Sequence, residues 1–485
     1  NGSLALPDIG IRQTLFGAYV QDDIRMDKTL TLNAGLRYEM VTVPTEAHGR
    51  TAILRNLTDP LPVCGVTTTG CSSTGPLFSN PTLRNFEPRI GFAWNPRQGR
   101  TLVRGGFGIF DVLPLPYEFT LSFQRVLPFF LNIVGNNIQA ESFPTGAFQQ
   151  LNGDLSSGSA YYADPEPKRN YVMQWNLSVA RQLTSTLALT FGYVGSRGVH
   201  QPYRVDNIDM VLPKPTSAGY EWPCGPNGSG NSCATGILPS GAPSSVLNPN
   251  FGRINATLWQ ASSSYDALQV DIAKHVSHGF TFHGAYTFGK SIDTLSATEA
   301  NDAFPNGLFN QLFFDQRTSR GLSDFNVAQT FVLNLTWEVP SPRVSSKAVE
   351  WIIGGWQLGA LYKASTGQPF TPILGGDSAG TKLDETGEVP SYIPGCNLTD
   401  PNFKKNSSGP IYINPNCFTL PTVPSAMATT LAYPCANFVG AAPAPSGQVY
   451  CANLRGSLGR NIVIGPGLSK MDFSARSRMT AGSSS

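Results

Sequence analysis

The chain has 485 residues and a formal net charge of +2, and charged residues make up only 14% of it. Soluble domains usually reach about 25% charged residues, and a nearly neutral chain without a Lys/Arg-rich run gives no reason to expect a nucleic-acid partner. No apolar run approaches the roughly 18 residues that a transmembrane helix requires.

Five pairs of alternating segments follow one another along the chain, each pair joined by a connection shorter than those between pairs. Period-two alternation around a short turn predicts a β-hairpin. The predicted hairpins are 14–25 with 29–41, 86–95 with 101–111, 171–183 with 187–197, 265–276 with 280–291, and 327–339 with 355–366. An eleventh, weaker strand is predicted at 470–477.

The fourth hairpin shows the pattern most clearly. Phe282, Tyr286 and Phe288 fall on one side of its second strand, while Thr281 and His283 fall on the other. Strands of about 10–12 residues exceed the ordinary length of about 5–6 and match the roughly 9–11 residues of a strand that crosses a bilayer. The pattern therefore predicts an all-β chain, a partial antiparallel up-and-down transmembrane β-barrel of about 11 strands.

Between the hairpins lie five long connections, roughly 43–85, 113–169, 198–263, 292–325 and 367–469. A compact soluble domain seldom contains structureless loops longer than about 12–15 residues. Short turns that alternate with long loops are typical of outer-membrane barrels, with the turns periplasmic and the loops extracellular.

The eight cysteines form four local pairs, all inside these long connections. Disulfides, and so an oxidising compartment, are the first interpretation. Zinc is the alternative, although closely spaced Cys-x-x-Cys knuckles are absent. Neighbour pairing is the simplest of 105 connectivities. The candidates are Cys64 with Cys71, Cys224 with Cys233, Cys396 with Cys417, and Cys435 with Cys451.

Several segments resemble the barrel of a known family. NFEPRIGFAWNP, TLVRGGFGIFD and YDALQVDIAKHVSHGFTFHGAYTFGKSID are similar to the C-terminal barrel of Oar-like TonB-dependent receptors, which are common in soil bacteria of the acidobacterial type. FGAYVQDDIRMDKTLTLNAGLRYE, RNYVMQWNLSVARQL and GGWQLGALYKASTGQPFTP match further segments in the same order.

The resemblance implies an outer-membrane receptor without an enzymatic activity or a cofactor, with outer-membrane lipid, the TonB complex and an unidentified solute as partners. Family barrels have about 22 strands, and no plug or TonB box precedes Gln13. The end of the chain, ARSRMTAGSSS, lacks a terminal aromatic residue. We therefore expect residues 1–485 to be a C-terminal barrel portion without its plug and N-terminal strands. Its open edges should prevent it from spanning a membrane unaided.

The faces opposite the apolar stripes carry charges of both signs. An Arg or Lys on the lipid face costs about 2–4 kcal/mol at mid-bilayer, so an inward position is expected. Structural ion pairs or contacts to a plug are the first interpretation, and contact with a translocated solute is the second. The candidates are Arg37, Glu39, Glu87, Arg89, Arg104, Asp271 and Lys363.

Other motifs carry weaker hypotheses. Tryptophans near the short turns predict an interfacial girdle, with ordinary core tryptophan as the alternative: Trp94, Trp337, Trp351 and Trp356. The G-x-S-x-G match at 376–380 lacks the strand–helix context of a nucleophile, and the histidines His275, His278 and His283 lack further ligands, so neither a catalytic nor a metal site is expected. Loop aromatics either pack on one another or hold a ligand: Tyr161, Tyr162, Tyr220, Trp222, Trp259, Phe309, Phe313 and Phe314.

Three functions remain open at this point. The first is TonB-energised uptake of a solute. The second is surface adhesion or an export-associated role that works through the long loops. The third is a secreted all-β binding module whose alternation buries a sandwich core.

Overall fold

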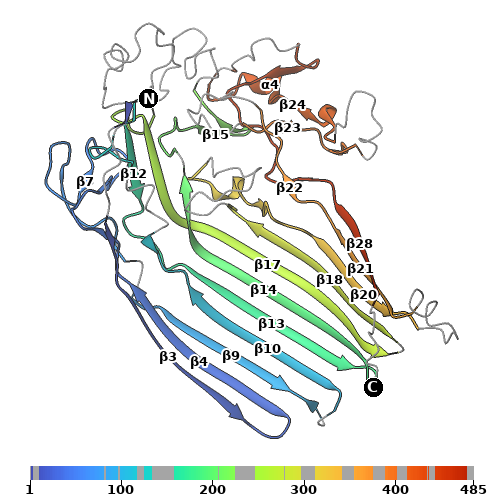
Figure 1. Cartoon of the computed structure of the whole chain (residues 1–485). Coiled ribbons are helices and arrows are strands. Elements are labelled where there is room, and N and C mark those ends of the chain that lie inside the picture. Colours follow the sequence, from blue (N-terminus) through green and yellow to red (C-terminus); the bar gives the residue numbers. More distant parts are fainter. Residues whose placement is uncertain are drawn as a thin grey trace.

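The structure is a computed structural model of the whole chain (Figure 1). It describes residues 2–3, 10–80, 83–96, 99–116, 125–130, 132–133, 158–205, 207–223, 246–277, 279–296, 312–340, 354–374, 388–400, 412–433, 435 and 443–477. No helix within these ranges is long and apolar enough to cross a membrane.

Eleven long strands form one antiparallel meander in which each strand pairs with the next long strand along the chain (Figure 1). They are β3 (Leu15–Arg25), β4 (Leu30–Val41), β9 (Phe86–Trp94), β10 (Thr101–Asp111), β13 (Tyr171–Gln182), β14 (Leu187–Val205), β17 (Arg253–Ser277), β18 (Phe280–Asp293), β20 (Gln329–Glu338), β21 (Trp356–Ser365) and β28 (Leu468–Ser477). The five predicted hairpins and the eleventh strand are confirmed as elements.

The prediction was wrong at the ends of the third and fourth hairpins. The residues 198–205 and 253–263 were assigned to a long connection, but β14 and β17 continue through them and stay paired as far as Val205 opposite Ala256. Register shifts near Gln201 interrupt this extension. Beyond that irregularity, Ala256 and Leu258 are buried, so the extra length is stabilised by packing that a two-residue period does not reveal.

The strand register sorts the side chains into two continuous faces. Val270 lies opposite Phe191 on one side and Tyr286 on the other, and Tyr286 lies opposite Phe331. We call this the apolar face. Its large exposed side chains include Phe16, Val20, Leu36, Phe86, Ile90, Phe107, Leu177, Phe191, Leu268, Phe288, Phe331, Trp337, Met471 and Phe473.

The opposite side, the polar face, follows the same register. Asp271 lies opposite Thr190 and Ala285, and Arg37 lies opposite Glu87. A slip of one residue in the pairing of two strands would exchange their two faces. Since apolar residues lie opposite apolar ones across these neighbouring strands, the pairing register is the one that the alternation predicts.

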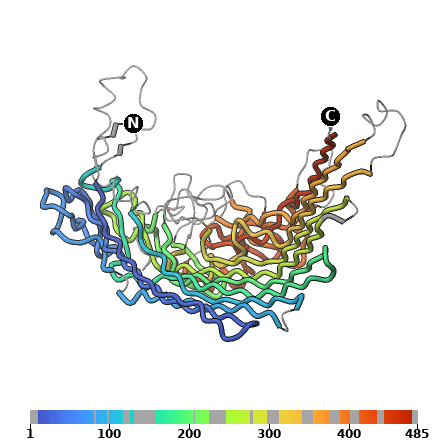
Figure 2. The backbone as a smooth tube through the Cα atoms, turned by 60° about the horizontal axis from the view of Figure 1, so that its bottom comes forward, coloured from blue at the N-terminus to red at the C-terminus, as the bar shows by residue number. Residues whose placement is uncertain are grey.

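The sheet is bent into an open trough (Figure 2). Its path ends at β3 and β28, and within the described residues no long strand pairs with their outer edges. All eleven residues of β3 and nine of the ten in β28 are exposed. The open edges agree with the expectation that this set of strands does not close by itself.

The short turns lie at one end of the sheet and the long connections at the other (Figure 1). We call the described residues of 42–85, 112–170, 198–263, 292–328 and 366–467 the loop layer. Phe78, Tyr161 and Trp259 share one buried cluster, and Tyr203 and Leu258 share another. Burying a large apolar side chain contributes roughly 1.5–3 kcal/mol. These connections are therefore folded, which corrects their treatment as structureless.

Short elements organise this layer and the N-terminal residues. They are β1 (Gly2–Ser3), β2 (Ile11–Arg12), β5 (Thr45–Glu46), β6 (Ala52–Ile53), β7 (Val63–Cys64), β8 (Ser73–Thr74), β11 (Asn132–Ile133), β12 (Ser159–Ala163), β15 (Lys214–Thr216), β16 (Gly219–Glu221), β19 (Gly321–Leu322), β22 (Pro369–Phe370), β23 (Ser391–Tyr392), β24 (Phe418–Thr419), β25 (Thr422–Pro424), β26 (Gln448–Tyr450), β27 (Val463–Ile464), the 3-10 turns η4 (Gln316–Thr318) and η6 (Pro415–Cys417), and the helix α4 (Ser425–Ala428).

Candidate functional site

The charged residues predicted for the barrel interior all lie on the polar face, but they do not form one cluster. Four of them come together on β4 and β9. Arg37 pairs with Glu39 two residues along the same strand, and Arg89 donates to Glu87 at 2.9 Å. The guanidinium of Arg89 also lies over the ring of Phe110, 4.5 Å from its centre. These four side chains form ion pairs within the wall.

The other three candidates are spread along the sheet. Asp271 lies 2.5 Å from Nε2 of His283 on the neighbouring strand. Arg104 and Lys363 are exposed, and neither has an ion pair within the described part of the chain. Lys363 lies opposite Lys470 on β28, so this part of the polar face carries two neighbouring cations.

One strong ion pair escaped the sequence analysis. Arg169, just before β13, donates from two nitrogens to the two carboxylate oxygens of Asp111 at the end of β10, at 2.7 and 2.8 Å. It also donates to the Phe86 carbonyl at 2.9 Å. Asp111 ends one predicted strand and Arg169 precedes the next. Because the ends of paired strands lie side by side, this ion pair could have been predicted from the sequence.

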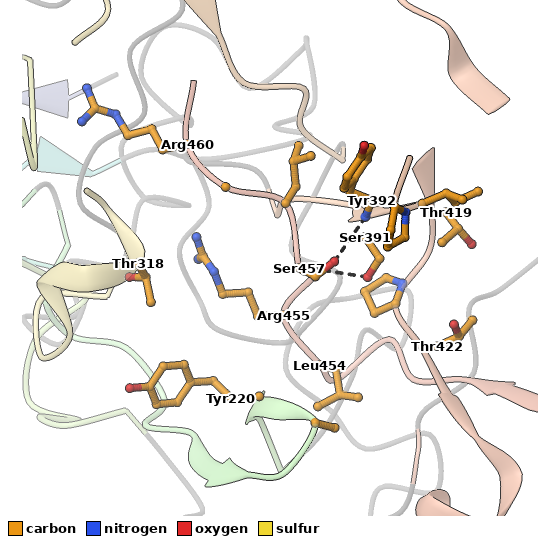
Figure 3. Close-up of a pocket in the computed structure, with 18 of the residues that line it drawn as sticks. Tyr220, Thr318, Ser391, Tyr392, Thr419, Thr422, Leu454, Arg455, Ser457 and Arg460 are labelled. Carbon is orange, nitrogen blue, oxygen red and sulfur yellow. Dashed lines mark hydrogen bonds between the residues drawn. The ribbon is translucent and has the colours of Figure 1, made fainter. Parts of the chain in front are cut away.

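An open pocket of about 740 Å³ lies in the loop layer. Its walls come from segments far apart in the sequence, around 218–220, 317–320, 391–394, 419–424 and 454–460. Figure 3 shows Arg455 projecting from the last of these segments toward the side where Thr318 lies. Four arginines line the pocket, and no described lining residue is a carboxylate: Arg317, Arg320, Arg455 and Arg460.

Hydrogen bonds between distant segments fix the walls of this pocket. The backbone N–H of Arg455 donates to the carbonyl of Tyr220 at 3.2 Å. The N–H of Tyr392 donates to Oγ of Ser457 at 3.2 Å, and the N–H of Ser457 donates to Oγ of Ser391 at 3.4 Å (Figure 3). Two parts of the β21–β28 connection, around 391 and 457, are therefore bonded to each other, and the second is also bonded to the strand 219–221. Together they enclose the pocket.

Arg460 joins the pocket to the wall. Its guanidinium donates to Oδ1 of Asp293 at 2.6 Å and to Oδ1 of Asp324 at 2.9 Å. It also donates to Oγ of Ser296 at 2.7 Å. Asp293 is the last residue of β18, so this buried network ties the pocket segment to the end of a long strand.

A second network holds the opposite side of the pocket. Asp315 accepts hydrogen bonds from Tyr220 Oη at 2.7 Å and from two nitrogens of Arg317 at 2.8 and 2.9 Å. The Arg317 guanidinium and the Tyr220 hydroxyl together hold the pKa of the Asp315 carboxyl well below its usual range. Asp315 also caps η4 through the backbone N–H of Arg317, so one carboxylate positions both pocket residues.

Three of the four predicted cysteine pairs are disulfide-bonded in the structure: Cys64–Cys71, Cys396–Cys417 and Cys435–Cys451. Cys224 and Cys233 lie outside the described residues. All three bonds are in the loop layer, at the end of the sheet opposite the short turns.

The loop aromatics mostly pack on one another. Tyr161, Trp222 and Trp259 are among the largest fully buried side chains. Tyr220 lines the pocket, and Phe314 packs edge-on against it with ring centres 5.5 Å apart. Tyr162 and Phe313 are partly buried, and Phe309 lies outside the described residues.

The remaining predicted features fall at both ends of the sheet. Trp94, Trp337 and Trp356 lie at short-turn ends on the apolar face. His275 lies at the same end, and the described residues contain no group of His, Cys, Asp or Glu that could hold a metal ion. Trp351, His278 and the segment 376–380 lie outside the described residues.

Comparison with known families shows which environment the two faces of the sheet belong to. A family model for the outer membrane beta barrel domain matches residues 2–484. The chain belongs to this family. Its place is the bacterial outer membrane, with the apolar face toward lipid, the short turns periplasmic and the loop layer extracellular.

The solved structures that this outer-membrane barrel chain resembles are similar to it at low sequence identity. The outer membrane transporter YddB from Escherichia coli is 10% identical with a TM-score of 0.41, covering 79% of this chain and 35% of its own. The FrpB iron transporter from Neisseria meningitidis is 10% identical with a TM-score of 0.36, covering 79% and 36%.

The ferric enterobactin receptor PfeA from Pseudomonas aeruginosa is 10% identical with a TM-score of 0.37, covering 78% of this chain and 34% of its own. The chain thus aligns with about a third of the length of these structures. No curated protein matches the sequence.

Proposed function

We propose that this chain forms the wall and outer loop layer of a receptor that takes up a solute across the outer membrane with energy delivered through TonB. The observation that carries the proposal is the apolar face, which runs in one register across the meander. A secreted module would bury such a face in its core, whereas here Ile90 is 61% and Phe288 54% exposed. Lipid is the solvent that suits this surface.

The resemblance to Oar-like receptors supports the energised mechanism and a plug domain that sits against the polar face. Among the seven predicted candidates on that face, Arg104 and Lys363 are the two without an ion pair in the described chain. We assign contact with the plug or the solute to these two, and structural pairing to Arg37, Glu39, Glu87, Arg89 and Asp271.

The test compares the native bacterium with a strain lacking the gene that contains this chain and with a strain lacking TonB. Spent medium from each culture is profiled for small solutes. A solute that the parent removes, and that both deletion strains leave behind, is the expected result. Complementation with the intact gene should restore its removal.

Adhesion or an export-associated role is the second candidate, favoured by a loop layer with its own buried core and disulfides. It predicts normal solute removal by the gene-deletion strain, together with a loss of surface attachment or of an exported product. That outcome would replace the uptake proposal.

A further inference from the structure

The pocket in the loop layer has features that specify a ligand class. We propose that it binds the oxyanion group, a phosphate or a carboxylate, of a small solute, with Arg455 and Arg320 as the residues that contact it. This proposal adds the chemical class of the solute to the proposed function. It rests on that function only for the uptake of the solute after it has bound.

The first argument is the arrangement of charge. Four arginines line one space, and no residue of its described lining is a carboxylate. Asp293 and Asp324 hold Arg460 from behind the wall, and Asp315 holds Arg317. The described lining therefore offers a solute arginines and no acidic side chain.

The second argument is the environment of the two contact residues. Arg320 is exposed at the end of η4, and Arg455 is half-buried. Burial lowers the pKa of the Arg455 guanidinium, and the nearby Glu388 only partly opposes this effect. A bound oxyanion would offset the lost hydration, because a planar guanidinium donates in pairs to phosphate and carboxylate oxygens.

The third argument is size and the remaining lining. A pocket of about 740 Å³ lies within the roughly 300–1,000 Å³ of small-molecule sites. Hydroxyl groups of Thr318, Thr422 and Ser457 and apolar surface from Leu454 and Ile393 complete the walls. The site therefore suits a solute larger than a bare anion, with hydroxylated or apolar parts beside its charge.

The experiment uses the intact protein purified from outer membranes in detergent. Calorimetric titration with glucose 6-phosphate and with citrate separates phosphate from carboxylate, and glucose is the uncharged control. We expect at least one anion to bind at least 10-fold more tightly than glucose, and its affinity to fall as NaCl is raised.

Variants assign the binding to this pocket. Arg455→Gln and Arg320→Gln should each weaken anion binding at least 5-fold, whereas Arg12→Gln, an exposed arginine elsewhere in the chain, should leave it unchanged. If Arg455→Gln fails to assemble, the exposed Arg320→Gln carries the test. Equal binding of glucose and both anions, or wild-type binding by the pocket variants, would overturn the proposal.

The two proposals fail in different ways. Solute removal by cells with no anion binding to the purified protein would reject the pocket and keep the transporter. Anion binding that the pocket variants abolish, with no solute removal lost in the deletion strains, would keep the pocket and reject uptake.

Discussion

Arg460 is the residue on which several distant segments of the loop layer meet. Its side chain is 4% exposed and contacts Asp293 and Asp324, which are 5% and 1% exposed. A buried ion pair contributes little net stability relative to an apolar replacement of the whole group, but removal of one partner leaves uncompensated charge. At this scale the loop layer depends on keeping both partners of each buried ion pair.

Arg460→Met is therefore expected to destabilise the loop layer by about 3–5 kcal/mol, because Asp293 and Asp324 would stay buried without a cation. Chemical denaturation of the detergent-solubilised protein, followed by tryptophan fluorescence, measures the change. Arg317→Met is the matched control, since its side chain is 88% exposed. A similar loss in both variants would contradict the argument.

Glu221 carries a second buried charge in the same layer. It is fully buried, and one of its carboxylate oxygens accepts from the backbone N–H groups of Ala432 and Tyr433 at 2.9 and 3.2 Å. Burial raises the pKa of this carboxyl despite these bonds and Lys214. The folded state therefore binds the proton more tightly than the unfolded state does.

The sign of the pH dependence follows. The stability that Glu221 contributes is fully present below its unfolded pKa of about 4.3 and is lost as pH rises through the raised folded value. Glu221→Gln should remove this part of the decline in melting temperature as the pH rises above about 4.3. The exposed Glu166→Gln serves as control, and an unchanged profile in the Glu221 variant would refute the assignment.

At the scale of the element, each long strand has one face toward lipid and the other toward the aqueous interior. Large residues of the apolar face pack beside glycines on neighbouring strands: a Cβ at Gly195 would collide with the Trp175 ring, and one at Gly105 with the Phe92 ring. Glycine in a strand costs backbone entropy, so its use here reflects the close approach of an aromatic side chain.

An added charge should destabilise the barrel far more on the apolar face than on the polar face. Phe191→Lys places an ammonium on the lipid side and should cost about 2–4 kcal/mol if it lies near the bilayer midplane. Thr190→Lys, one residue earlier and opposite Asp271, should cost little. The amount of heat-modifiable, folded protein in the outer-membrane fraction measures both. Equal yields would contradict the assignment of the faces.

At the scale of the whole molecule, two regions are stabilised by different means. The sheet relies on hydrogen-bonded strands and on lipid against its apolar face, whereas the loop layer has buried clusters and disulfides of its own. The Cys396–Cys417 and Cys435–Cys451 bonds both lie in the β21–β28 connection, which supplies much of the pocket. The two regions should therefore lose structure independently.

Replacing Cys435 and Cys451 together by serine is expected to destabilise the loop layer by about 2–4 kcal/mol, as for a disulfide that closes a short loop. Limited proteolysis should cut the β21–β28 connection sooner, while the long strands remain protected in detergent. Wild-type protein treated with a reductant should behave alike. Simultaneous loss of the strands would show that the two regions are coupled.

The sequence by itself determined the existence and order of the long strands, their two faces and the end of the sheet that carries the cysteines, but not the extensions of β14 and β17. Alternation with a period of two is a local signal, and every long strand, from Phe16 and Val20 in β3 to Met471 and Phe473 in β28, repeats it against its neighbours. Short turns fix the pairing within each hairpin, and the barrel topology that the alternation predicts supplies the pairing of each hairpin with the next.

Only the tertiary structure decided how the long connections fold. Arg460 meets Asp293 and Asp324 across 167 and 136 residues of chain, and Tyr220 meets Asp315 across 95. No periodicity links such residues, because irregular backbone is held by specific packing and hydrogen bonds and not by a repeated pattern. Those contacts form the pocket and bring its arginines together. The sequence therefore predicted the barrel wall but not the candidate binding site.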